Sequence, residues 1–321
     1  MKRFANILLV VDESTDHEVA LERAVALAIS NQAALTVCDV VADVPAEMQM
    51  FVTAVSPAEL AEIVVNERRD RLEEIVEKTK VHGLSISVRV RMGKPFLEVI
   101  RQVLECGHDL VIKSAEGEKG LKPTLFGSAD MHLMRKCPCA VWVVNSAEHK
   151  QYRRILAAVD QDPEDATKEV LNRQILEMAT SLALSEFSEL HIVHAWTLFA
   201  ERFWRSARSG LSDAEVDAME SEEAGRRLRW LKQVVHKYGN KADKGATDYL
   251  KPELHVVKGD PKQVIPATAR DLDVDLVIMG TIARTGIPGF FMGNTAESIL
   301  NQIDCSVLTI KPPGFESPVS I

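Results

Sequence analysis

The chain has 321 residues, enough for about two ordinary domains, and its composition of 46% hydrophobic and 26% charged residues is that of a globular protein. A net charge of −9 argues against a broad basic surface for nucleic acid or for an anionic membrane. Five cysteines in a chain of this length do not make a disulfide scaffold, which favours a reducing compartment.

The chain opens with an apolar run at residues 7–11, which is shorter than the roughly 7–15 apolar residues of a signal peptide. No apolar stretch approaches the roughly 20 residues needed to span a bilayer. We therefore expect a soluble, cytoplasmic protein with no membrane span and no nucleic-acid partner.

Apolar runs alternate with helical patterns through the first half. The first run ends in Asp12, and over residues 19–28 apolar side chains recur at three- and four-residue steps, which is the period of a helix. Later apolar runs of this half predict strands at residues 35–41, 86–91, 109–112 and 140–144. Helices are predicted at residues 57–80, after the Gly-Lys-Pro turn at Gly93, and at residues 129–135.

The same order of elements returns in the second half, which indicates an internal duplication. "ILLVVDES" at Ile7 matches "ILAAVDQD" at Ile155, and "HDLVIKS" at His108 matches "VDLVIMG" at Val274. Second-half strands are predicted at residues 155–160, 190–196, 254–258, 275–279 and 307–310, with helices at 212–238 and 296–302. We predict two copies of one domain, residues 1–147 and 151–321.

Nearly all-apolar strands that alternate with helices predict, in each copy, an open α/β domain of about five parallel strands with helices on both faces. In such sheets ligands bind outside the carboxyl ends of the strands, where the strand order reverses. Asp12, Asp160 and the glycine-rich segments all follow strands, so we expect them to gather at that edge.

The second glycine-rich segment suggests a phosphate site. Gly280 ends a predicted strand, and Gly293, Asn294 and Thr295 open a predicted helix. Backbone N–H groups at a helix start bind anions, and glycine lets a phosphate approach closely. A tight turn without a ligand explains the same residues equally well, and the chain has no P-loop motif.

These motifs, with "GTIARTGI" and "FMGNTAE", resemble those of the universal stress proteins in a tandem arrangement. The family pattern is Gly-x2-Gly-x9-Gly-Ser/Thr after the fourth strand, with an aspartate ending the first strand. The resemblance implies flavodoxin-like domains of the adenine nucleotide alpha hydrolase-like type. It also implies ATP or another adenine nucleotide in some members and none in others.

The resemblance implies that the first-strand aspartate and the end of the second strand hold adenine, and that the glycine motif holds ribose and phosphates. In the second copy these residues are Asp160, His194, Gly280, Arg284, Gly293, Asn294 and Thr295. In the first copy they are Asp12, Ser114, Gly117, Gly127 and Ser128.

Both copies depart from the family pattern. Ala283 stands at the second glycine of the second copy and Asn294 at its Ser/Thr position, while Ser114 stands at the first glycine of the first copy. The first copy also carries Glu116 and Glu118, which would repel phosphate unless Lys119 or Lys122 compensates.

No metal site is expected. His191 and His194 are three residues apart on a predicted strand and therefore point to opposite faces. Cys137 and Cys139 have no second cysteine pair or nearby histidine to complete a zinc set. The aromatic and basic segment at residues 198–208 is interpreted as an amphipathic lid.

Two functions remain open. The first is a stress-response protein that binds an adenine nucleotide or another small molecule, as a sensor or carrier without robust catalysis, although slow nucleotide hydrolysis is not excluded. The second is a scaffold whose degenerate sites bind no nucleotide, or bind another small ligand. We also expect the two domains to pair inside the molecule, residues 140–144 against 307–310, and a homodimer stays open.

Overall fold

A computed structural model describes residues 4–13, 15–43, 56–79, 83–117, 125–146, 151–162, 165–242, 245–281 and 292–321. They form two compact units. The first unit comprises the described residues up to 146 together with Met292 and Ser306–Ile321, and the second comprises the described residues from 151 to 281 together with Gly293–Cys305. The last strand therefore folds with the first unit, although the sequence repeat places its residues in the second copy.

The sheet of the first unit has the strand order β3-β2-β1-β4-β5-β10. Its strands are β1 (Asn6–Val10), β2 (Ala34–Val41), β3 (Ile86–Met92), β4 (Leu110–Ser114), β5 (Ala140–Val144) and β10 (Ser306–Ile310). The first five are parallel, and β10 is antiparallel to β5. The central strands are fully buried, Leu8 and Val111 among them, as helices on both faces of a parallel sheet require.

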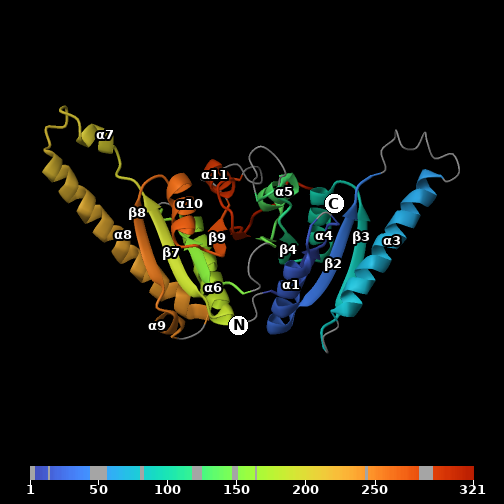
Figure 1. Ribbon diagram of the computed structural model, residues 1–321. Coiled ribbons are helices and arrows are strands. Elements are labelled where there is room, and N and C mark those ends of the chain that lie inside the picture. Colours follow the sequence, from blue (N-terminus) through green and yellow to red (C-terminus); the bar gives the residue numbers. More distant parts are fainter. Residues whose placement is uncertain are drawn as a thin grey trace. The chain divides into compact units, whose positions relative to one another are not determined.

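Helices cover both faces of this sheet. They are α1 (Glu18–Asn31), α3 (Pro57–Lys78), α4 (Pro95–Cys106) and α5 (Ser128–Lys136). Helix α1 contacts β1, β2 and β4, α3 contacts β2 and β3, and α4 packs with α5 (Figure 1). Helix α3 begins with a capping box, because Ser56 accepts from the Glu59 amide and the Glu59 carboxylate accepts from the Ser56 amide.

The second unit has four parallel strands in the order β9-β6-β7-β8. They are β6 (Arg154–Ala158), β7 (Glu189–Trp196), β8 (Glu253–Lys258) and β9 (Leu276–Gly280). The helices are α6 (Ala166–Glu186), α7 (Glu201–Trp204), α8 (Asp213–Ala242), α9 (Ala246–Leu250), α10 (Pro261–Asp271) and α11 (Asn294–Leu300). Helix α6 packs against α8, and α10 packs against α11.

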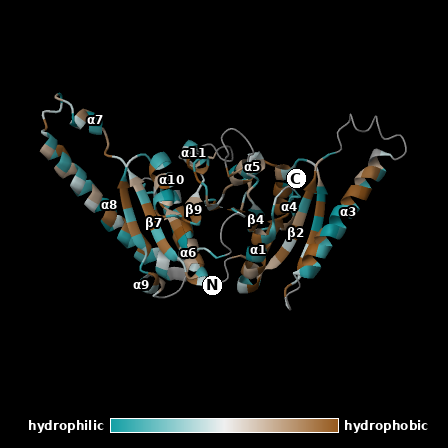
Figure 2. Ribbon diagram, viewed as in Figure 1, coloured by the Kyte–Doolittle hydropathy of each residue, from teal (hydrophilic) through white to brown (hydrophobic). Residues whose placement is uncertain are grey.

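The long helices are amphipathic. Figure 2 shows hydrophobic and hydrophilic residues side by side along α3 and α8. In α8 the apolar side is fixed by buried residues such as Val216, Leu231 and Val235. None of the helices that the structure describes is long and apolar enough to cross a membrane.

The pairing of the two last strands is confirmed. In the β5–β10 ladder, Val143 lies opposite Val307 and Trp142 lies opposite Leu308. The Thr309 hydroxyl donates to the carbonyl oxygen of Val141 at 3.2 Å. Strand β10 therefore covers the apolar edge that β5 would otherwise expose.

The segment after β10 caps the end of α5. The Lys311 ammonium donates to the carbonyl oxygens of Met134 (2.5 Å) and Arg135 (3.3 Å), and the Ser317 hydroxyl donates to that of Lys136 (2.8 Å). A cation at the carboxyl end of a helix is favourable, but Lys311 is deeply buried. Burial lowers the pKa of Lys311 to about 7, although the nearby Cys137 and Cys139 thiols oppose the shift.

The buried seam between β5 and β10 predicts a large effect of Leu308→Ala. Leu308 is fully buried, so the change should lower the free energy of unfolding by about 2–5 kcal/mol. Denaturant titration measures this, with Ile321→Ala at an exposed position as the control. A loss similar to that of the control would contradict the packing of β10 described above.

Lys311→Met tests the burial of the lysine. The folded-state pKa of Lys311 is about 7, below the ordinary value of 10.5. Between these two pH values the lysine is protonated in the unfolded chain but neutral in the folded protein, so the free energy of unfolding rises with pH. The wild type should therefore gain free energy of unfolding relative to K311M between about pH 6 and about pH 9. A difference between the two proteins that stays constant over this range would contradict the prediction.

Candidate functional site

The strand order reverses once in each unit. In the first unit β1 lies between β2 and β4, and in the second β6 lies between β7 and β9. Ligands of open α/β sheets bind beyond the carboxyl ends of the strands at such a reversal. Asp12 follows β1 and Ser114 ends β4, while Asp160 follows β6 and Gly280 ends β9. The structure thus places these four predicted residues at the reversal point of their own unit.

In the first unit a hydroxyl bridges the reversal point. Ser114 is buried, and its Oγ donates to the carbonyl oxygen of Asp16 at 2.6 Å. The carbonyl oxygen of Asp12 accepts from the Thr15 amide at 3.2 Å, which closes the loop after β1 into a tight turn. The family's glycine could not make the Ser114 bond, so this departure from the motif joins two loops that a ligand would have to enter.

The first turn of α5 also receives a carboxylate from its own chain. The Ala129 amide donates to Glu116 Oε2 at 3.3 Å, and a Cβ added to Gly127 would overlap this carboxylate. Gly127 is therefore needed for the close approach of Glu116. Backbone amides at a helix start can bind an anion, and here one of them donates to the Glu116 carboxylate.

A second acid and a buried cation complete this arrangement. Asp130 Oδ2 accepts from the backbone amides of Glu116 (2.9 Å) and Gly127 (3.0 Å). The Lys113 ammonium lies 2.5 Å from Asp130 Oδ1 and 2.9 Å from Glu116 Oε1. Burial alone would lower the pKa of Lys113, but Asp130 and Glu116 outweigh burial and raise it, so the lysine is charged. We call Lys113, Glu116 and Asp130 the internal acid cluster.

The remaining predicted residues of the first unit are near this cluster. Gly117 has a φ of +60°, a left-handed conformation that glycine adopts without strain, and its amide donates to the Leu125 carbonyl oxygen at 3.0 Å. Ser128 is the exposed first residue of α5. Glu118 lies outside the described residues.

The second unit has no internal acid cluster at its corresponding positions. The repeat aligns Gly127 with Gly293, and both glycines precede the helix that follows the motif. At the same offset, buried Met279 and Ala296 replace Lys113 and Asp130. In the sequence Ile282, outside the described residues, replaces Glu116. The start of α11 therefore lacks the two carboxylates that fill the start of α5.

Local packing explains part of this arrangement in the second unit. A Cβ added to Gly280 would approach the end of the Leu171 side chain of α6 too closely, so the glycine allows this side chain to pack where it does. The Gly293 amide donates to the Thr281 carbonyl oxygen at 2.9 Å, which positions the start of α11. Asn294 is exposed and Thr295 is half-buried at that start. Arg284 lies outside the described residues.

Asp160 lies on the loop after β6, where its amide donates to Asn172 Oδ1 at 3.1 Å. Its carboxylate forms an ion pair with Lys168, which also lies 3.4 Å from Asp162, yet the Asp160 side chain is 59% exposed. Asp160 therefore keeps carboxylate oxygens accessible at the reversal point.

The side chain of His194 is closed off. It is 1% exposed, Nδ1 lies 3.2 Å from the Val159 carbonyl oxygen, and the ring lies against Trp230 of α8 with centroids 5.0 Å apart. Burial lowers the pKa of His194, which keeps the ring neutral. The ring supports the loop that carries Asp160, and the buried side chain is not accessible to a ligand.

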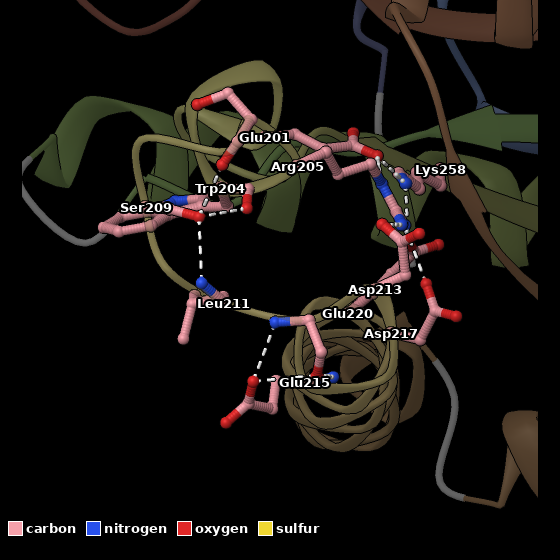
Figure 3. Close-up of polar contacts among 12 residues, drawn as sticks. Glu201, Trp204, Arg205, Ser209, Leu211, Asp213, Glu215, Asp217, Glu220 and Lys258 are labelled. Atoms are coloured by element: carbon pink, nitrogen blue, oxygen red, sulfur yellow. Dashed lines mark hydrogen bonds and ion pairs between the residues drawn. The ribbon is translucent and has the colours of Figure 1, made fainter.

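The segment around α7 is held by an ion-pair network (Figure 3). Arg205 binds Glu201 (3.1 Å), Asp217 (2.9 Å) and Glu220 (3.1 Å). Lys258, at the carboxyl end of β8, binds Glu201 at 2.7 Å and Glu220 at 2.6 Å. The predicted amphipathic lid is thus a short helix tied to β8 and α8, and the positive charge of Lys258 is already matched by two carboxylates.

The model of the Universal stress protein family matches residues 3–145 and 151–311, once for each copy. The chain belongs to the universal stress protein family. The tandem arrangement predicted from the motifs is confirmed.

Two relatives match this chain over nearly their whole length. The chain is 29% identical over 325 residues to Universal stress protein E of Escherichia coli K12, covering 100% of this chain and 98% of the relative. It is 28% identical over 316 residues to the Universal stress protein E homolog of Haemophilus influenzae, covering 97% and 98%.

Two solved structures share the fold. A functionally unknown protein of Pseudomonas aeruginosa PAO1 has a TM-score of 0.68 at 24% identity, covering 97% of this chain and 94% of its own. A universal stress protein of Archaeoglobus fulgidus has a TM-score of 0.57 at 18% identity, covering 95% and 98%. The predicted α/β fold is confirmed.

Sequence reasoning anticipated Glu116 as an obstacle to phosphate but missed its partners. Lys119 and Lys122 were the expected compensating cations, and both lie outside the described residues. The structure supplies Lys113 instead, from inside a strand, together with Asp130. The available signal was a lysine in the otherwise apolar run "HDLVIKS", where an unpaired charge would be costly.

Lys113→Met should destabilise the first unit strongly, because it leaves two carboxylates at a buried site without their cation. Breaking a buried ion pair from one side costs about 3–5 kcal/mol. Denaturant unfolding of K113M measures the loss. The control is the triple variant K113M/E116I/D130A, which copies the residues of the second unit and should recover most of it. Equal losses in the two variants would contradict an electrostatic cause.

Proposed function

We propose that this universal stress protein is a stress-response binding protein that holds one adenine nucleotide, or a chemically related anion, in its second unit. The observation that carries the proposal is the contrast between the two helix starts. Glu116 already occupies the first turn of α5, whereas buried apolar side chains replace Lys113 and Asp130 near α11. The first unit then serves as a scaffold.

Electrostatics favours the second unit for an anionic ligand. The internal acid cluster contains two carboxylates and one ammonium group, so it carries a net negative charge. A phosphate group about 4 Å from the Glu116 carboxylate would be repelled by roughly 4 kcal/mol at an effective dielectric constant of 20. That is close to a thousandfold in affinity. The Ser114–Asp16 hydrogen bond adds a second obstacle in the first unit.

In the second unit the edge offers groups suited to a nucleoside phosphate. The exposed Asp160 carboxylate can accept hydrogen bonds from a base or a ribose, and the amides at the start of α11 suit a phosphate. The exposed Asn294 amide can donate to a phosphate oxygen. These groups bind and orient a ligand, which suits a sensor or carrier of nucleotide without robust turnover.

Asn294→Asp tests the assignment with an isosteric change. A carboxylate at the start of α11 should repel phosphate and lower the affinity for ATP at least tenfold, while it should leave the unliganded protein as stable or slightly more stable. Isothermal titration with ATP should give one site per chain in the wild type. The matched control is Asn301→Asp at the other end of α11, which adds the same charge and should bind ATP like the wild type.

Native mass spectrometry of the purified protein identifies a co-purified ligand independently. Two sites per chain, or binding that survives N294D but is lost on a change in the first unit, would contradict the assignment to the second unit. No binding of any adenine nucleotide, and none co-purified, would instead support the scaffold function for both units.

A further inference from the structure

A second group of chemically reactive side chains lies in the amino-terminal half of the β7–β8 pair. His191 of β7 is the register partner of Glu253 of β8, and His255 follows two residues later on the same strand. Because side chains alternate along a strand, all three project from one face of the sheet. His194 projects from the other face, toward Trp230. The group is therefore separate from the predicted ligand edge at the carboxyl ends.

The nitrogen and oxygen atoms of this group converge. His191 Nδ1 lies 3.1 Å from His255 Nε2 and 3.5 Å from Glu253 Oε2, and one ligand atom from each residue fits within 4.8 Å of the others. With zinc–ligand bonds of about 2.0–2.1 Å, the first two distances correspond to angles of roughly 100° and 115° at a shared ion, near the tetrahedral value. The Glu253 side chain is exposed and can rotate to bring its carboxylate closer to His255 Nε2.

The other ring nitrogen of His191, Nε2, has the surroundings that are typical of a metal-bound histidine. His191 is 5% exposed, and its Nε2 is buried without a hydrogen bond within the described residues. The Glu189 carboxylate lies 3.9 Å from that nitrogen. When a metal binds one histidine nitrogen, the other carries the proton and usually faces a carboxylate. Glu189 is in position for this role, and Arg154 holds it at 3.2 Å.

We propose that His191, Glu253 and His255 form a binding site for a zinc-type divalent cation, with Glu189 as the outer carboxylate. Two imidazoles and one carboxylate are a ligand set that suits zinc and related first-row ions. The three residues leave the fourth position to water, because Glu253 is exposed and His255 is half-buried.

A simple hydrogen bond between the two imidazoles is the competing explanation. That bond needs a proton between His191 Nδ1 and His255 Nε2, and a bound metal ion replaces it.

Titration of the full-length, tag-free protein with zinc chloride, in the absence of nucleotide, tests the site. The variants are Glu253→Gln and His255→Gln, since both positions are accessible and should fold normally. We expect the wild type to bind one equivalent of zinc. Loss of a carboxylate or carbonyl partner behind a ligand typically costs about 10–100-fold in metal affinity, and loss of a ligand itself in either variant should cost at least as much. His236→Gln, at an exposed position on α8, is the matched control and should bind as the wild type does.

Cobalt absorption separates this site from the cysteines. Cys137 and Cys139 have sulfur atoms 3.5 Å apart and could bind a metal as thiolates, which would give intense charge-transfer bands. Nitrogen and oxygen ligation at the proposed site should give weaker visible bands that H255Q abolishes. The proposal would be overturned if E253Q and H255Q bound zinc as the wild type does, or if the wild type bound no more zinc than H255Q. A cobalt spectrum dominated by thiolate bands would also overturn it.

Discussion

Backbone N–H groups at the start of a helix have no partners within the helix, so something must accept their hydrogen bonds. In this protein the helix that follows each glycine motif imposes that constraint at the strand-order reversal. The first unit meets it with Glu116, which reaches the Ala129 amide, and with Asp130, which takes the Gly127 amide. In the second unit, Ala296 stands at the described position that corresponds to Asp130, so α11 does not receive this carboxylate.

Filling a ligand site with the chain's own carboxylate introduces charges that need a partner. Lys113 supplies the partner from within a buried strand, and the carboxylates around it keep it charged. A functional site commonly trades stability for binding, and a site that is no longer used can be filled with stabilising contacts. Duplication permits such a difference under the proposed function, because one copy would bind the ligand and the other would not need to.

The fold was predictable because it depends on local apolar patterns. The runs that end in Asp12 and Asp160, and the match of Gly127 with Gly293, placed the strands, the repeat and the reversal edge within a few residues of their observed positions. Which groups fill each site was not predictable, because side chains distant in sequence meet there. Ser114 donates a hydrogen bond to Asp16, which is 98 positions away in the sequence, and the local spacing of apolar residues gives no information on such a contact.

Strand β7 shows how the same limit applies to histidines. The alternation of side chains correctly places His191 and His194 on opposite faces, and that argument by itself gave no reason to expect a metal site. That argument could not supply the register of β8, which sets His255 beside His191 although the two residues are 64 positions apart in the sequence. One strand then serves two purposes: its carboxyl half supports the loop of Asp160 through His194, and its amino half presents His191 to a neighbouring strand. The two histidines are separated by the sheet itself, so a change at one is not transmitted to the other by direct contact.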